Sequence, residues 1–204
     1  MKKYKHHVVK RKIHIFCNGE LAEPNYFKEL KDHFKISTIV IHFKRFQALS
    51  PWDFIKKVVE ELETVRIKDF SKEDGDQCWC VFDVDNYLKD NKKEFERMIK
   101  FAGDNNVKLA WSNECFELWY LLHFQAVTSS ISRKDFDFKL SKHFNKYDKK
   151  GYKKNDAGFF LRLLEKQELA IKNAKKLSNN LQDNPSTSIW KLIEEIKKLK
   201  GDEN

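Results

Sequence analysis

The sequence is poor in proline and glycine and has no long run of apolar residues. Among 204 residues there are only three Pro and six Gly, too few for collagen-like or long disordered segments. No stretch approaches the roughly 18 to 20 consecutive apolar residues that a membrane-spanning helix requires. The first residues are charged, unlike a signal peptide. We therefore expect a packed protein that stays in the cytoplasm and has no membrane partner.

Cysteine and glycine motifs are also scarce. The four cysteines include no C-x-x-C pair, so a zinc knuckle or a disulfide framework is disfavoured, and we expect buried, reduced thiols. The chain has no P-loop, no G-x-G-x-x-G and no nucleophile elbow. These absences argue against the glycine cradles of ATP and dinucleotide enzymes, and against Ser-His-Asp or Cys-His catalysis.

The net charge is strongly positive, at +9, with a pI near 9.2. A basic excess attracts polyanions, so DNA or RNA is an expected partner. A lysine-rich composition with solvated helix faces explains the same excess, and the charge alone does not choose between the two. The lysines that we predict to contact nucleic acid lie in one basic stretch: Lys146, Lys149, Lys150, Lys153 and Lys154.

Strand-like and helix-like periodicity alternate along the first 130 residues. Extended, apolar runs cover residues 12–17, 37–43, 78–82 and 107–111. Helical spacing follows each of them, over residues 24–34, 51–70, 91–105 and 115–124. The alternation predicts an α/β fold with βαβ crossovers and a mostly parallel sheet flanked by helices.

The last third of the chain has a different, helical character. We expect a short helix at 136–144, a basic loop at 146–154, a long amphipathic helix at 156–180 and a last helix at 186–200. Residues 184–187 are typical of a turn with a helix cap. We predict two units, an α/β core over residues 1–130 and a helical C-terminal extension over residues 131–204 packed on it.

Acidic residues follow the predicted strands, at the edge where parallel α/β sheets bind ligands. The most informative pair is Asp83 and Asp85, because a long apolar strand delivers both and packing does not explain two carboxylates. Residues two apart on an extended chain face one side. Mg²⁺ or Mn²⁺ takes one or two carboxylates together with waters and phosphate oxygens. We predict a metal site here; the alternative is that the two residues cap a turn or helix.

Four other side chains at this edge are candidates for catalysis. Glu20 and Glu23 follow the first strand, and an acid there can complete a cation site for phosphoryl transfer. Asn113 and Glu117 follow the fourth strand, where both can point toward the crevice. His123 ends the next helix and is more simply a hydrogen-bond donor or a C-terminal cation than a ligand.

Four separated motifs, in this order along the chain, resemble the RloB-like proteins found beside bacterial restriction and phage-defence loci. They are IFCNGELAEPNYF (15–27), CWCVFDVD (78–85), SNECFELWYLLHF (112–124) and NPST (184–187). The resemblance implies a TOPRIM-like core, the phosphoryl-transfer fold of topoisomerases, primases and OLD-type nucleases. It also implies that Asp83 and Asp85 hold Mg²⁺ and that an AAA-type ATPase is encoded nearby.

The resemblance further implies a catalytic Glu after the first strand, at the position where this chain has Asn18. An amide carries no proton at neutral pH and offers no charged oxygen to a metal, although Glu20 or Glu23 could substitute. Two functions follow from this. One is a metal-dependent nuclease or phosphodiesterase of phage defence and abortive infection; the other is a catalytically degenerate chain that binds nucleic acid or a nucleotide beside the ATPase. Neither motif nor composition sets the oligomeric state.

Overall fold

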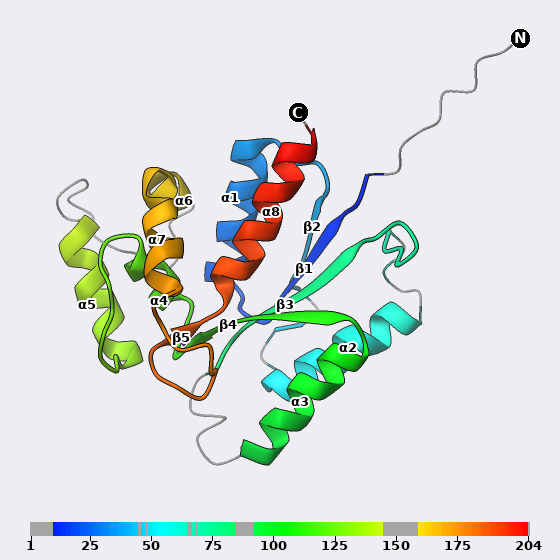
Figure 1. Ribbon diagram of the computed structural model, residues 1–204, viewed down its shortest axis with the longest axis horizontal. Coiled ribbons are helices and arrows are strands. Elements are labelled where there is room, and N and C mark those ends of the chain that lie inside the picture. Colours follow the sequence, from blue (N-terminus) through cyan, green and yellow to red (C-terminus); the bar gives the residue numbers. More distant parts are fainter. Residues whose placement is uncertain are drawn as a thin grey trace, which may run out of the picture.

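A five-stranded sheet runs through the centre of the molecule, as the computed structural model shows (Figure 1). The structure describes residues 10–44, 46–47, 49–64, 67, 69–84, 92–144 and 159–203. The strand order is β2-β1-β3-β4-β5, with the first four strands parallel and β5 antiparallel to β4. The strands are β1 (Ile13–Cys17), β2 (Ile39–His42), β3 (Gln77–Asp83), β4 (Val107–Asn113) and β5 (Ser186–Thr187).

Both faces of the sheet are covered, which explains the apolar composition of its central strands. In β3, Trp79 and Val81 belong to one hydrophobic cluster, and Cys80 and Phe82 belong to the cluster on the opposite face. Alternate side chains of a strand point to opposite faces, so an unbroken apolar run fits two packed layers. The predicted α/β class and mostly parallel sheet are confirmed.

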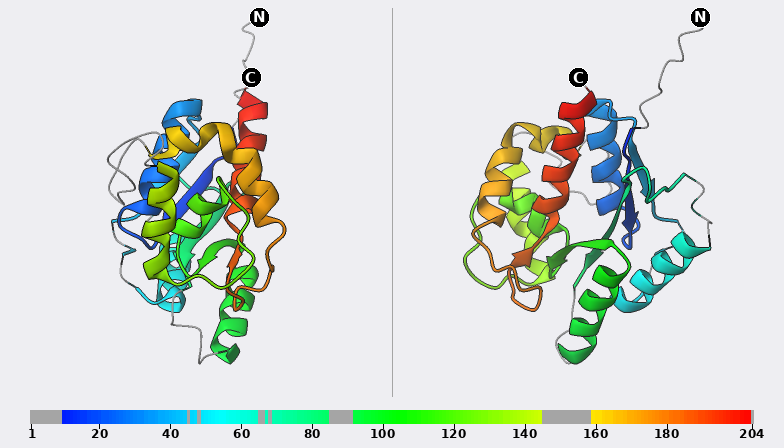
Figure 2. Two further views of the ribbon diagram at one scale, coloured as in Figure 1. Left: turned by 90° about the vertical axis from the view of Figure 1, so that its left-hand side faces the viewer. Right: turned by 45° about the vertical axis from the view of Figure 1, so that its right-hand side comes forward.

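Helices form one layer on each side of the sheet (Figures 1 and 2). On one face lie α1 (Ala22–Phe34) and α8 (Ile189–Glu203), and on the other lie α2 (Pro51–Glu63) and α3 (Lys92–Asp104). The start of α2 follows local sequence rules, because Pro51 occupies its first turn and the Ser50 hydroxyl accepts a 3.1 Å hydrogen bond from the Asp53 N–H.

A second group of helices lies beside α1 and α8, at the left of Figure 1. They share one hydrophobic cluster with β1, α1 and α8, so residues before and after position 130 pack in the same core. This group consists of α4 (Glu117–Leu122), α5 (Arg133–Phe144), α6 (Phe159–Leu163), the 3₁₀ helix η2 (Leu164–Lys166) and α7 (Gln167–Ala174). None of the described helices is long and apolar enough to cross a membrane.

Three predicted elements differ from the structure. The helix expected at 51–70 ends at Glu63. The single helix expected at 156–180 is, in its described part, divided into α6, η2 and α7. The last of these, α7, is docked on α4, because the buried Asn173 side chain donates a 2.9 Å hydrogen bond to the Leu122 carbonyl.

The third difference is β5, which forms where a turn with a cap was predicted. Thr187 lies opposite Ser112 in β4, and their hydroxyl oxygens are 3.0 Å apart. The Thr187 hydroxyl also donates a 2.7 Å hydrogen bond to the Trp111 carbonyl. The strand therefore depends on partners that lie about 75 residues earlier in the chain.

Candidate functional site

The strand order places a topological switch point between the carboxyl ends of β1 and β3, the position where parallel α/β sheets bind ligands. From β1 the chain moves outward to β2, and it then crosses to β3 and β4 on the other side of β1. At such a reversal the connections leave in opposite directions, which opens a ligand site at the strand ends. The Asn18 N–H donates a 3.0 Å hydrogen bond to the Val81 carbonyl, so the loop after β1 begins beside the end of β3.

Asp83 ends β3 at this switch point, and both of its carboxylate oxygens accept hydrogen bonds. Oδ1 accepts the Phe116 N–H at 2.9 Å, and Oδ2 accepts Nη2 of Arg133 at 2.8 Å. Asp83 therefore caps the turn that begins α4, 33 residues later in the chain. The turn that follows β3, which the capping alternative concerned, lies outside the described residues. Sequence reasoning missed Arg133, because no local pattern distinguishes it from the other basic residues.

Glu23 is buried at the same end of the sheet, in the first turn of α1. Its carboxylate lies so close to Gly19 that a Cβ there would be 1.9 Å from Oε2 of Glu23. Only glycine leaves room for this arrangement. Burial raises the pKa of the Cys17 thiol, and the charge of the nearby Glu23 carboxylate also raises it. Since Cys17 ends β1, Glu23 lies beside the end of this strand. Glu20, in contrast, is exposed.

Glu117 and Asn113 are both buried, but their side chains contact different parts of the structure. Burial raises the pKa of the Cys115 thiol, and the Glu117 and Asp83 charges add to this, so the three side chains are neighbours. The Asn113 side chain donates a 3.0 Å hydrogen bond to the Leu181 carbonyl and so fastens the segment that precedes β5. The structure thus brings Glu23, Asp83 and Glu117 to adjacent strand ends.

Asn18 holds a neighbouring loop. Its side-chain NH₂ donates a 2.9 Å hydrogen bond to the Leu49 carbonyl, and its Oδ1 accepts the Leu49 N–H at 3.4 Å. The amide therefore pairs with the backbone before α2 as an adjacent strand would, which a carboxylate cannot do because it has no N–H donor.

Asn18→Ala is expected to lower the free energy of unfolding by about 1 to 2 kcal/mol, because it removes two partly buried hydrogen bonds. Urea unfolding of the variant and the wild type measures the difference. Asn179→Ala, at an exposed loop position, is the control for deletion of the same side chain. Equal stability of the Asn18→Ala variant and the wild type would show that the loop does not depend on Asn18.

The described residues supply only part of the predicted metal and nucleic-acid sites. Asp85 and the lysine stretch 146–154 lie outside them. Within the described ranges, no group of three or more His, Cys, Asp or Glu side chains is placed to hold a metal ion. Asp83 offers the hard oxygen that Mg²⁺ prefers, but Arg133 already lies on one of its oxygens. The fit to a metal ion is therefore incomplete in this part of the chain.

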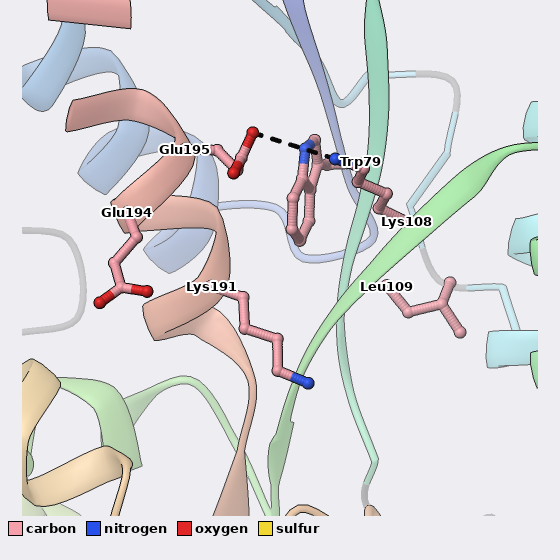
Figure 3. A pocket seen from close by; sticks show the side chains of 6 residues that line it. All are labelled: Trp79, Lys108, Leu109, Lys191, Glu194 and Glu195. Carbon is pink, nitrogen blue, oxygen red and sulfur yellow. Dashed lines mark ion pairs between the residues drawn. The ribbon is translucent and has the colours of Figure 1, made fainter. Parts of the chain in front are cut away.

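A separate hollow of about 430 Å³ lies between α8 and the beginning of β4 (Figure 3). Two of its charged residues, Lys108 and Glu195, pair with each other. Lys108 Nζ lies 4.0 Å from a Glu195 oxygen and 5.2 Å from the centre of the Trp79 ring, and Gln77 hydrogen-bonds to both Lys108 and Glu195. Because Trp79 and Lys108 are near the starts of their strands, this hollow is remote from the acidic edge.

Of the comparisons with known proteins, the one with protein-family models gave a match. A family model described as RloB-like protein matches residues 13–196. Comparison with curated proteins and with solved structures found no match. The matched range includes all strands of the described sheet and the residues of the acidic edge. Since it spans nearly the whole chain, the protein belongs to the RloB-like family.

Proposed function

We propose that this chain is a TOPRIM-like, metal-dependent nuclease or phosphodiesterase that acts in phage defence, with its reaction centre at the acidic edge. The observation that carries the proposal is the placement of Glu23, Asp83 and Glu117, from α1, β3 and α4, at the carboxyl ends of neighbouring strands. Two of these carboxylates are buried, and natural folds retain such costly groups where chemistry needs them.

The residues have different parts in this proposal. Asp83 and Asp85 would hold Mg²⁺ or Mn²⁺, which neutralises phosphate charge and activates water when it is bound. Glu23 is the carboxylate that the fold places beside the end of β1, so we assign to it the proton transfer that Asn18 cannot perform. Glu117 neighbours Asp83 and supports its negative charge density.

Asp83→Asn is expected to reduce cleavage by at least about 100-fold, because it removes the charge at the end of β3 but keeps the oxygen that caps Phe116. Labelled DNA and RNA are incubated with protein while Mg²⁺ or Mn²⁺ is titrated, and EDTA provides the metal-free control. Asp104→Asn, at an exposed position at the end of α3, is the matched variant and should cleave like the wild type. Undiminished cleavage by Asp83→Asn would refute the proposed site.

The second candidate function is a non-catalytic subunit that binds nucleic acid or a nucleotide beside an AAA-type ATPase. The observation that favours it is the Asn18 amide, which is engaged with Leu49 where the family resemblance implies a catalytic Glu. Wild-type protein that binds DNA or RNA but cleaves neither at any metal concentration would select this function. Asn18→Glu is less informative, because it also removes the N–H donor to the Leu49 carbonyl.

A further inference from the structure

Arg133 lies at the opening of the acidic edge, at the beginning of α5. Its Nη2 is 2.8 Å from Oδ2 of Asp83, and 47% of its side chain is exposed while only 20% of the Asp83 side chain is. A partly exposed guanidinium is therefore held against the carboxylate at the end of β3.

Two motif residues hold the backbone that carries Arg133. The Glu114 carboxylate accepts the Arg133 N–H at 2.8 Å through Oε2. The Asn184 side chain accepts the Ile131 N–H at 3.3 Å and donates to the Ile131 carbonyl at 3.3 Å. Asn184 also donates to Oε1 of Glu114 at 3.5 Å, which joins the two supports. Segments that are distant in the sequence therefore converge to fix one arginine.

This degree of positioning is more than a stabilising ion pair requires. Ion pairs with an exposed partner contribute only about 0 to 1 kcal/mol to folding. The planar guanidinium has several N–H donors in a fixed fork that matches phosphate oxygens, and it can contact a carboxylate and a phosphate together. Asp83 would then fix the orientation of the fork, and the exposed part of the side chain would meet the ligand.

We propose that Arg133 binds a backbone phosphate of the nucleic-acid substrate and that Asp83, Glu114 and Asn184 position it. This inference rests on the proposed function and adds to it the residue that recognises the substrate. It assigns a role to two motif residues, Glu114 and Asn184, that the proposed catalytic groups leave unexplained.

The test measures binding of a labelled single-stranded oligonucleotide, as DNA and as RNA, in EDTA over a range of salt concentrations. Arg133→Gln is expected to weaken binding by about 10-fold or more, as expected for loss of a charge-assisted hydrogen bond. The slope of log affinity against log salt should fall by about 0.7, the value for one phosphate contact on a single strand. Arg133→Lys should keep most of the slope and regain part of the affinity.

Lys134→Gln is the matched control, since it removes the same charge at the next, exposed position and should bind within about twofold of the wild type. Thermal unfolding confirms that each variant is folded. Equal affinity of Arg133→Gln and Lys134→Gln would overturn the role of Arg133, and the proposed nuclease would stand if the wild type still cleaves. Selective loss of binding supports Arg133 whether or not the wild type cleaves. A wild type that neither binds nor cleaves would overturn both proposals.

Discussion

Phe136→Ala is expected to lower the free energy of unfolding by about 3 to 5 kcal/mol, the typical cost of deleting a buried aromatic ring. Phe136 is 1% exposed and belongs to the large hydrophobic cluster that includes α1 and α8. Phe138, two residues further along α5, is 64% exposed. Phe138→Ala should therefore cost less than about 1 kcal/mol, even though Lys142 Nζ lies 4.1 Å from its ring centre.

Urea unfolding of the two variants measures this contrast within one helix and one residue type. The difference between the two losses of unfolding free energy tests whether α5 packs on the core through Phe136. This helix also carries Arg133, at its first position. Similar losses for the two variants would mean that α5 does not pack on the core through this face. A large loss for Phe136→Ala alone would establish the support on which the position of Arg133 depends.

The stability of the protein is expected to fall as the pH drops from about 7 to about 4, and His123 should be a main cause. The pKa of His123 is lowered from 6.5 to about 4, mainly by burial and to a smaller extent by the charge of Lys166. Its Nδ1 lies 2.9 Å from the Trp119 carbonyl oxygen and so carries the hydrogen of the neutral ring. The sequence interpretation of a hydrogen-bond donor fits, whereas that of a C-terminal cation is wrong at neutral pH.

The sign follows from which state binds more protons. Between pH 6.5 and about 4, the unfolded chain protonates His123 while the folded chain does not, so acid favours unfolding. The full effect is about 3 kcal/mol at pH 4 and below, and it is absent above about pH 7. His14, whose pKa burial also lowers, acts in the same direction.

Denaturant unfolding at several pH values measures the slope of the free energy of unfolding. His123→Gln retains a side-chain N–H donor but does not titrate, so its curve should be flatter than that of the wild type by about 2 kcal/mol between pH 7 and pH 5. Parallel curves for His123→Gln and the wild type would contradict the assignment.

The elements with strong local patterns could be predicted from the sequence. The apolar run of β3 and the Ser50 and Pro51 start of α2 gave the correct elements, because their signals lie within a few residues of one another. Asp83 was predicted to lie at the carboxyl end of its strand, and it does end β3. The buried, free state of the cysteines is also as predicted.

The contacts that define the site could not be predicted in the same way. The hydrogen-bond partners of Asp83 lie 33 and 50 residues further along the chain. The partner of Asn18 lies 31 residues away, so the family resemblance implied a Glu at this position but gave no sign that the amide holds the loop at Leu49. Such pairings depend on how the layers assemble, and no local propensity encodes them.

The short strand β5 also has a consequence for how the protein is made. Its pairing joins Ser112 to Thr187, and the Ser188 hydroxyl accepts the Trp111 N–H at 3.0 Å, across 77 residues. During synthesis β4 is made well before Thr187 and Ser188. Until these residues have been made, that end of β4 lacks its hydrogen-bond partners. Closure of such distant contacts slows folding, so the sheet is completed only after the segment around Thr187 has been made.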